Sequence, residues 1–196
     1  LRGAALADFN GNGRVDIVVA TESDDQVIIV YDNGDIEVIF ERNSKFQSSP
    51  SVATVNGEKI IFVGCDDDHF YGINKHGEII FDVETGDNIR SSAAFTNFNG
   101  NLIVFFGSYD GYLYAFDQNG IALDGWPLDI GGEINISPVV TDLDGDATPE
   151  ILVGNTNGMI FAFNLDGSLV SPFPVSSTGG YSGTPTIADI DGDGDL

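Results

Sequence analysis

Short apolar runs alternate with polar turns along the whole chain, and the turns are rich in Gly, Asn and Asp. A typical stretch contains the runs "SPSVATV", "KIIFVGC", "HFYGINK" and "EIIFDVE" in succession. Runs of this length, bounded by such turns, predict β-strands. No segment shows the period of an amphipathic helix, so the pattern predicts an all-β protein.

The turns recur at a nearly constant spacing. One set of Asn-Gly or Asp-Gly pairs begins at residues 10, 56, 99, 144 and 191, with separations of 46, 43, 45 and 47 residues. A second set keeps step with it and consists of Asn33-Gly34, His76-Gly77, Asn119-Gly120 and Asp166-Gly167. Asn-Gly between apolar runs marks a tight hairpin. Four strands in each repeat of this length predict a β-propeller of four-stranded blades.

The repeat predicts about four and a quarter blades in a single propeller domain or propeller fragment. The expected blades are 1–46, 47–90, 91–134 and 135–180, with the start of a fifth at 181–196. An open ring would expose the apolar faces of its terminal blades, and such patches are seldom left in water. We therefore expect further sequence beyond Leu1 and Leu196, or self-association through the open ends.

Acidic residues crowd the predicted loop between the first two strands of the fourth blade. In "DLDGDATPE" the first, third, fifth and ninth positions are Asp142, Asp144, Asp146 and Glu150, and the seventh is Thr148, whose carbonyl can add a ligand. Alternate side chains of a tight loop converge on one centre, and hard oxygen ligands suit calcium. The spacing predicts a calcium site in this loop.

Two other loops carry the same spacing. The first holds Asp8, Asn10, Asn12, the carbonyl of Arg14, and Asp16; its two amides predict a lower affinity. The fifth supplies Asp189, Asp191 and Asp193 and is incomplete in this sequence. We therefore expect two calcium sites and an incomplete third. The second and third repeats have only "TVNGEK" and "NFNGNL", so we expect no metal there.

Two alternatives to this interpretation have to be weighed. An EF-hand requires a glutamate at position 12 and flanking helices, whereas that position is Val19 or Val153 within a strand-like run. The second alternative is a set of polar turns, because Asp, Asn and Gly dominate turns for local reasons. Two full matches in phase with the repeat favour calcium.

The charge of the chain limits its partners. Against 31 acidic residues there are 7 basic ones, which gives a net charge of −24, although 42% of the residues are hydrophobic. Such repulsion argues against nucleic acid and anionic membranes as partners. No apolar run approaches the length of a membrane span, and Cys65, the single cysteine, cannot form an internal disulfide.

Few residues qualify for catalysis, and we assign none as catalytic. His69 follows Asp66, Asp67 and Asp68, which could form an acid–base pair, but a solvated turn is the favoured interpretation. Cys65 has no basic neighbour in sequence that would activate its thiol. Trp126 could stack on a sugar ring or pack between blades, and packing is favoured.

The loop at 8–16 resembles the FG-GAP repeats of integrin α-subunit propellers and of many bacterial extracellular proteins. The pattern of that family is Asp-x-Asp/Asn-x-Asp/Asn-Gly-x-x-Asp, and the fourth loop departs from it at Ala147 and Glu150. This resemblance implies calcium binding, an adhesive role and an extracellular, cell-surface or periplasmic location. The stretches "GSYDGYLYAFDQNG" and "GNTNGMIFAFNLDG" are also similar to quinoprotein-type propeller repeats, which implies the fold alone.

Two functional hypotheses follow. The first is a calcium-stabilised extracellular propeller that acts as a binding or adhesion scaffold for a protein or glycan. The alternative is a propeller enzyme, either a calcium-dependent polysaccharide lyase, with Arg42, Lys45 or Arg90 near the proton to be removed, or a quinone-dependent dehydrogenase. The single Trp weakens the quinone version.

A ligand surface is expected at the end of the blades opposite the metal loops. It is formed by the turns between second and third strands and by the connections between blades, and we predict that it binds a neutral glycan or a basic protein. Its main residues are Asp67, His69, Tyr109, Asp110 and Trp126. Further members are Asp24, Asp25, Asp66, Asp68, Asn155, Asn157 and Tyr181.

Overall fold

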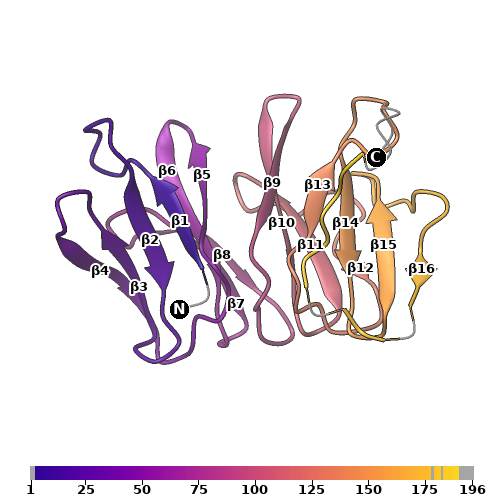
Figure 1. The fold of residues 1–196 in the computed structure, drawn as a ribbon, viewed down its shortest axis with the longest axis horizontal. Helices are drawn as coiled ribbons and strands as arrows, with labels where there is room; N and C mark the ends of the chain where they lie inside the picture. The colour runs from indigo at the N-terminus through magenta and orange to yellow at the C-terminus, as the bar shows by residue number, and fades with distance from the viewer. Residues whose placement is uncertain (1–2, 178, 182, 190–196) are drawn as a thin grey trace. The chain divides into compact units, whose positions relative to one another are not determined.

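The structure is a computed structural model that describes residues 3–177, 179–181 and 183–189. These residues form sixteen strands and no helix, and the strands build four antiparallel sheets of four strands each (Figure 1). The predicted all-β fold with four-stranded blades is confirmed. Of the expected fifth blade, residues 183–189 contain no strand, and 190–196 lie outside the described residues.

The chain divides into two compact units, Leu1–Ala93 and Ala94–Leu196. In the first unit, one sheet consists of β1 (Ala4–Ala7), β2 (Asp16–Ala20), β3 (Gln26–Val30) and β4 (Ile36–Glu41), paired in chain order. The other sheet consists of β5 (Ser51–Val55), β6 (Glu58–Gly64), β7 (His69–Ile73) and β8 (Ile79–Glu84), again in chain order.

The second unit repeats this arrangement. Its first sheet contains β9 (Ala94–Phe98), β10 (Asn101–Gly107), β11 (Tyr112–Asp117) and β12 (Leu128–Asp129). Its second contains β13 (Val139–Thr141), β14 (Glu150–Gly154), β15 (Met159–Phe163) and β16 (Val175–Ser176). Because all neighbours are antiparallel, the first-to-second and third-to-fourth connections of every sheet lie at one end. The second-to-third turn lies at the other end.

Burial follows the position of a strand within its sheet. The second strands are the most apolar: β14 is buried along its whole length, and β6 from Ile60 to Gly64. The outer strand β4 exposes Ile36 and Val38 and buries Phe40. A strand covered on both faces must be apolar throughout, whereas an outer strand needs an apolar face only where it packs.

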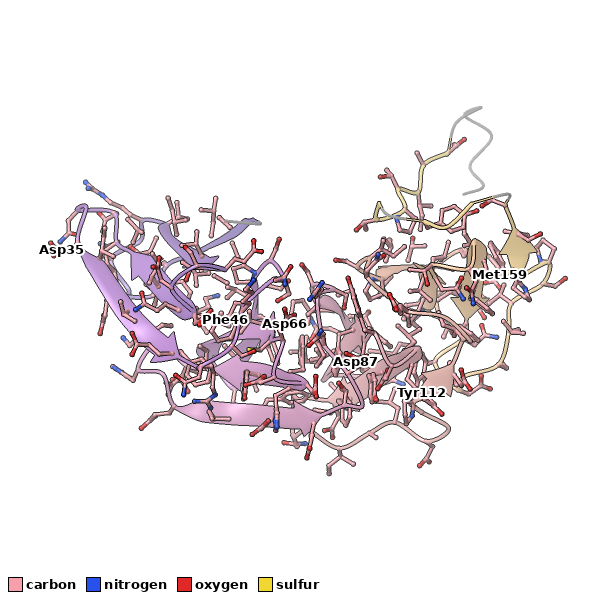
Figure 2. The ribbon with its side chains drawn as sticks, turned by 90° about the horizontal axis from the view of Figure 1, so that it is seen from below. Asp35, Phe46, Asp66, Asp87, Tyr112 and Met159 are labelled. Atoms are coloured by element: carbon pink, nitrogen blue, oxygen red, sulfur yellow. The ribbon has the colours of Figure 1, made fainter. Side chains whose placement is uncertain are left out.

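Each unit has its own apolar core between its two sheets. In the first unit Phe46 lies between the sheets (Figure 2), together with Val18, Val63 and Ile73. The sheets approach so closely that a side chain at Gly77, in the β7–β8 turn, would collide with the carbonyl oxygen of Ile39 in β4. In the second unit the core includes Phe105, Leu113, Trp126, Ile134 and Val153.

Candidate metal centre

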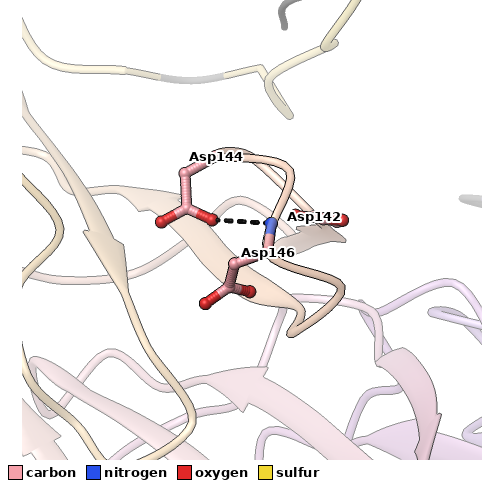
Figure 3. A group of neighbouring side chains, drawn as sticks. All are labelled: Asp142, Asp144 and Asp146. Carbon is pink, nitrogen blue, oxygen red and sulfur yellow. Dashed lines mark hydrogen bonds between the residues drawn. The ribbon is translucent and has the colours of Figure 1, made fainter.

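The β13–β14 loop is folded around its aspartates. The carboxylate of Asp142 accepts hydrogen bonds from the backbone N–H of Gly145 (2.8 Å) and of Ala147 (3.0 Å). Oδ1 of Asp144 accepts from the N–H of Asp146 (3.2 Å), as Figure 3 shows, and Oδ1 of Asp146 accepts from that of Thr148 (2.6 Å). Each aspartate offers an oxygen within 4.8 Å of the other two. The spacing predicted from the sequence therefore brings three carboxylates together.

Glu150 closes this loop from the first position of β14. It is fully buried, and its Oε2 accepts a hydrogen bond from the N–H of Leu143 (2.7 Å). Its Oε1 is buried without any hydrogen-bond partner among the described residues. Burial raises the pKa of Glu150, and the nearby charges of Asp144, Asp146 and Asp142 raise it further. Burying a carboxylate oxygen without a hydrogen-bond partner beside three other carboxylates lowers the stability of the fold, unless a bound cation neutralises the charge.

The β1–β2 loop has the same internal hydrogen bonds, position by position. Asp8 accepts from the N–H groups of Gly11 (2.7 Å) and Gly13 (2.8 Å). The N–H of Asn12 donates to Oδ1 of Asn10 (3.1 Å), and the N–H of Arg14 donates to Oδ1 of Asn12 (2.8 Å). The two loops, although different in sequence, are built on one backbone pattern.

Asp16 occupies in this loop the place of Glu150 in the other, at the first position of the second strand of its sheet. It is fully buried, and its Oδ2 accepts from the N–H of Phe9 (2.9 Å). Its Oδ1, however, accepts from the N–H of Asp32 (2.9 Å) and lies 3.5 Å from Nδ2 of Asn10. The carboxylate of the first loop is therefore satisfied by the protein itself, unlike that of the fourth loop.

Both loops turn through left-handed backbone at their fourth and sixth positions. In the first loop these are Gly11 (φ 78°) and Gly13 (φ 82°), which adopt such angles readily. In the fourth loop they are Gly145 (φ 79°) and Ala147 (φ 69°). A side chain in this region costs about 1 kcal/mol, so Ala147 introduces strain where the family pattern has Gly.

The remaining first-to-second connections differ from these loops. The β5–β6 and β9–β10 connections are two-residue turns, Asn56-Gly57 and Asn99-Gly100, with positive φ at both residues. That is the geometry of a type I′ hairpin turn, which leaves no loop for side chains to surround an ion. Of the incomplete third site, Asp189 is exposed, and Asp191 and Asp193 lie outside the described residues.

The opposite ends of the sheets carry a repeated Asp–Tyr pair. The hydroxyl of Tyr71 donates to Oδ2 of Asp67 (2.8 Å), and that of Tyr114 donates to Oδ2 of Asp110 (2.6 Å). Burial, followed by the hydrogen bond to Asp110, raises the pKa of Tyr114; burial also raises the pKa of Tyr71. Asp67 and Asp110, both predicted to line a ligand surface, thus also hold a neighbouring phenol in place.

His69 differs from its predicted surroundings. It is the first residue of β7 rather than part of the turn, and its Nδ1 lies 2.7 Å from Oδ1 of Asp82 in β8. Its ring stacks on Tyr71, with 5.5 Å between centroids. The hydrogen bond with Asp82 is the main cause of its raised pKa. The suggested pairing of its ring with the preceding aspartates is wrong, because His69 belongs to the third strand and its ring faces the fourth.

Two of the three basic residues considered for a lyase are held by acidic or aromatic neighbours. Nε of Arg90 donates to Oδ1 of Asp66 (2.9 Å), and its Nη2 to Oδ2 (3.0 Å). The guanidinium of Arg42 lies 4.2 Å from the centroid of the Phe40 ring, and its Nε donates to the hydroxyl of Tyr71 (3.1 Å). Both guanidinium groups donate hydrogen bonds in these contacts, so neither is placed to accept a proton from a substrate. Lys45 lines a pocket with Glu22, Ser23 and Asp25.

Cys65 is fully buried, and burial raises the pKa of its thiol to about 12. Its Sγ contacts the carbonyl oxygen of Ser44 at 3.7 Å. A thiol with such a pKa is protonated at neutral pH, so it is a poor nucleophile.

Trp126 is packed, as favoured from the sequence, but it lies at the other end of its sheet from the predicted ligand surface, whereas Asn155 lies in the predicted second-to-third turn. Trp126 belongs to the β11–β12 connection, at the same end as the first-to-second turns, because the fourth strand begins after it and not before it. It is only 7% exposed and packs against Phe105 and Phe163, while its Nε1 donates to the carbonyl of Leu165 (2.8 Å). Asn155 is also buried, and its Nδ2 donates to the carbonyl of Ile130 (2.7 Å).

Comparison with solved structures identifies the fold. The chain is similar to Bap1, a biofilm matrix protein of V. cholerae (23% identity, TM-score 0.70, 92% of this chain and 29% of that chain). It is also similar to BBS1N in complex with ARL6DN (14% identity, TM-score 0.65, 91% of this chain and 56% of that chain). A third similar structure is BamB from Moraxella catarrhalis (17% identity, TM-score 0.63, 96% of this chain and 53% of that chain). The chain spans between 29% and 56% of the length of these structures. No curated protein sequence matches it.

The model of the FG-GAP-like repeat matches residues 142–196, a segment that begins at the first aspartate of the β13–β14 loop. The part of the chain that the structure describes contains no helix that is long and apolar enough to cross a membrane. The match starts at Asp142, the first position of the predicted calcium pattern, and the similar solved structures support the fold of four-stranded blades. The chain therefore has the fold of β-propeller blades and carries, over residues 142–196, an FG-GAP-like repeat.

Proposed function

We propose that this chain is a calcium-stabilised part of a β-propeller that serves as a binding or adhesion scaffold outside the cell or in the periplasm. One observation carries the calcium proposal. Oε1 of Glu150 is buried and unpaired beside Asp142, Asp144 and Asp146. A buried anion in that position requires a cation, and four carboxylates at this spacing favour calcium.

The residues of both loops fit such an ion. In the fourth loop it would be held by Asp142, Asp144, Asp146, the carbonyl of Thr148 and Glu150. In the first loop it would be held by Asp8, Asn10, Asn12, the carbonyl of Arg14 and Asp16. Calcium supplies no reaction step here; it neutralises the carboxylates and ties the first strand of a blade to its second. The fourth loop is the tighter site, because it has more carboxylates and an unsatisfied one.

The scaffold proposal rests on the fold and on the surface charge. Among similar structures, Bap1 is a biofilm matrix protein and BBS1N was crystallised in complex with ARL6DN. The net charge of −24 favours a basic protein or a neutral glycan over a polyanion. The ligand would contact the second-to-third turns, which carry Asp67 in the first unit and Tyr109 with Asp110 in the second. Self-association through terminal blades stays a prediction.

A binding screen tests the scaffold proposal. The calcium-loaded chain is applied to immobilised neutral glycans and basic peptides, and separately incubated with uronic-acid polysaccharides. We expect specific binding that Asp67→Asn or Tyr109→Ala weakens, and no unsaturated sugar product. Asp35→Asn, in a hairpin at the other end of the first sheet (Figure 2), is the control and should bind as the wild type does. Turnover at a catalytic rate, or binding that neither substitution affects, would contradict the proposal.

A further inference from the structure

Asp32 lies in the β3–β4 turn, which the sheet topology places at the same end as the β1–β2 loop. Its Oδ1 accepts from Nδ2 of Asn12 (2.8 Å) and lies 3.5 Å from Nδ2 of Asn10. Its Oδ2 accepts from Nη1 of Arg14 (3.3 Å), and its own N–H donates to Oδ1 of Asp16 (2.9 Å). One residue outside the loop thus contacts four of the five positions expected to surround the ion.

These contacts fix which end of each amide points toward the loop centre. An asparagine presents either an oxygen acceptor or an NH₂ donor, and only the oxygen can bind a cation. The NH₂ group of Asn12 donates to Asp32, and that of Asn10 lies 3.5 Å from both Asp32 and Asp16, whereas the two amide oxygens accept from backbone N–H groups inside the loop, those of Asn12 and Arg14.

The same residue adds charge where the loop is short of it. The first loop contains two carboxylates, Asp8 and Asp16, whereas the fourth contains four. In the fourth blade the corresponding turn position is Leu165, as shown by the matching turn bonds from Gly34 to Tyr31 and from Gly167 to Asn164. The loop with four carboxylates therefore has a neutral leucine at the turn position where the loop with two carboxylates has an aspartate.

We propose that Asp32 is a positioning residue of the first metal site: it orients the amide oxygens of Asn10 and Asn12 toward the ion and contributes the negative charge that the amides lack. This inference rests on the calcium binding proposed for the β1–β2 loop. Residues behind the ligands of a metal site commonly change metal affinity by about 10- to 100-fold.

The test isolates the first site. Calcium affinity is measured by calorimetry in an Asp144→Ala background, with Glu150→Gln as a second background in case the first folds poorly. We expect Asp32→Asn to weaken calcium binding about 10-fold or more, and Asp32→Ala to weaken it at least as much. Asp35→Asn removes the same charge from the same turn and should leave the affinity unchanged. Unfolding by denaturant in chelator shows for each variant whether stability without metal has changed.

The outcomes separate the two proposals. If the parent background binds calcium and Asp32→Asn binds equally well, the role of Asp32 is refuted while calcium binding stands. The same holds if Asp32→Asn lowers stability in chelator and leaves the affinity unchanged, since that is a purely structural effect. If the parent backgrounds bind no calcium, the proposed metal site of the first loop and the role of Asp32 both fail.

Discussion

Glu150→Gln is expected to remove most of the calcium-dependent stability of the fourth blade without destabilising the metal-free chain. The ionised carboxylate of Glu150 is buried, and its Oε1 is unpaired, so in chelator it opposes folding. A neutral amide of the same shape relieves this penalty and can donate to a neighbouring aspartate. With calcium bound, the same carboxylate becomes favourable. One site is worth ~1 kcal/mol a few-fold above Kd and ~2.7 kcal/mol at 100-fold.

The pH dependence of the stability provides a second test of the role of Glu150. The pKa of Glu150 is raised above 4.5 in the folded chain, so the folded state binds the proton more tightly than the unfolded state does. Stability in chelator should therefore fall as the pH rises from 4.5 through the raised pKa, and Glu150→Gln should lose this contribution. Denaturant unfolding in chelator and in calcium measures both effects. Glu133→Gln, at a glutamate of the same unit outside the metal loops, is the control. A Glu150→Gln variant that keeps the full calcium response would contradict the assignment.

Gly77→Ala is expected to destabilise the first unit by about 2 to 4 kcal/mol. Gly77 has φ 76°, so any side chain there costs about 1 kcal/mol from the backbone alone. In addition, a Cβ atom would collide with the carbonyl oxygen of Ile39, a backbone atom that cannot move aside without displacing β4. Overpacking of this kind adds about 1 to 3 kcal/mol. Thermal or denaturant unfolding measures the loss.

A matched glycine isolates the collision. Gly100 has φ 81°, and no atom lies within 4 Å of the place where its Cβ would be. Gly100→Ala should therefore cost only about 1 kcal/mol. Equal losses for the two substitutions would show that the β7–β8 turn does not pack on β4 as described.

Local chemistry explains why much of this structure could be predicted from the sequence. Tight turns such as Asn56-Gly57 and alternation of turns with apolar runs depend on neighbouring residues, so the strands and the four-stranded sheets could be predicted. The metal loops are equally local. Each of their shared hydrogen bonds joins groups within seven residues, and the Asp or Asn spacing alone indicates them.

The residues that the sequence analysis missed or misplaced depend on contacts between strands. Asp32 meets the first loop only because β1 to β4 pair in order, which brings the β3–β4 turn beside the β1–β2 loop. The strand order was predictable, and counting the acidic residues of that turn would have revealed Asp32. His69 is opposite Glu84 in the register of β7 and β8 and reaches Asp82, the residue opposite Tyr71, along the diagonal, a contact that depends on the pairing of the two strands. Trp126 was misplaced because β12 has only two residues and leaves little sequence signal.

Thermal unfolding of the unmodified chain in millimolar calcium, in magnesium and in excess chelator tests the central claim most directly. We expect calcium to raise the melting temperature, by about 2 to 4 °C for each kcal/mol of binding, and magnesium to reproduce little of the increase. The smaller ion demands an octahedral geometry that these loops do not favour. Melting curves in calcium and in chelator that superimpose would contradict the account, and the acidic loops would then be turns without a metal.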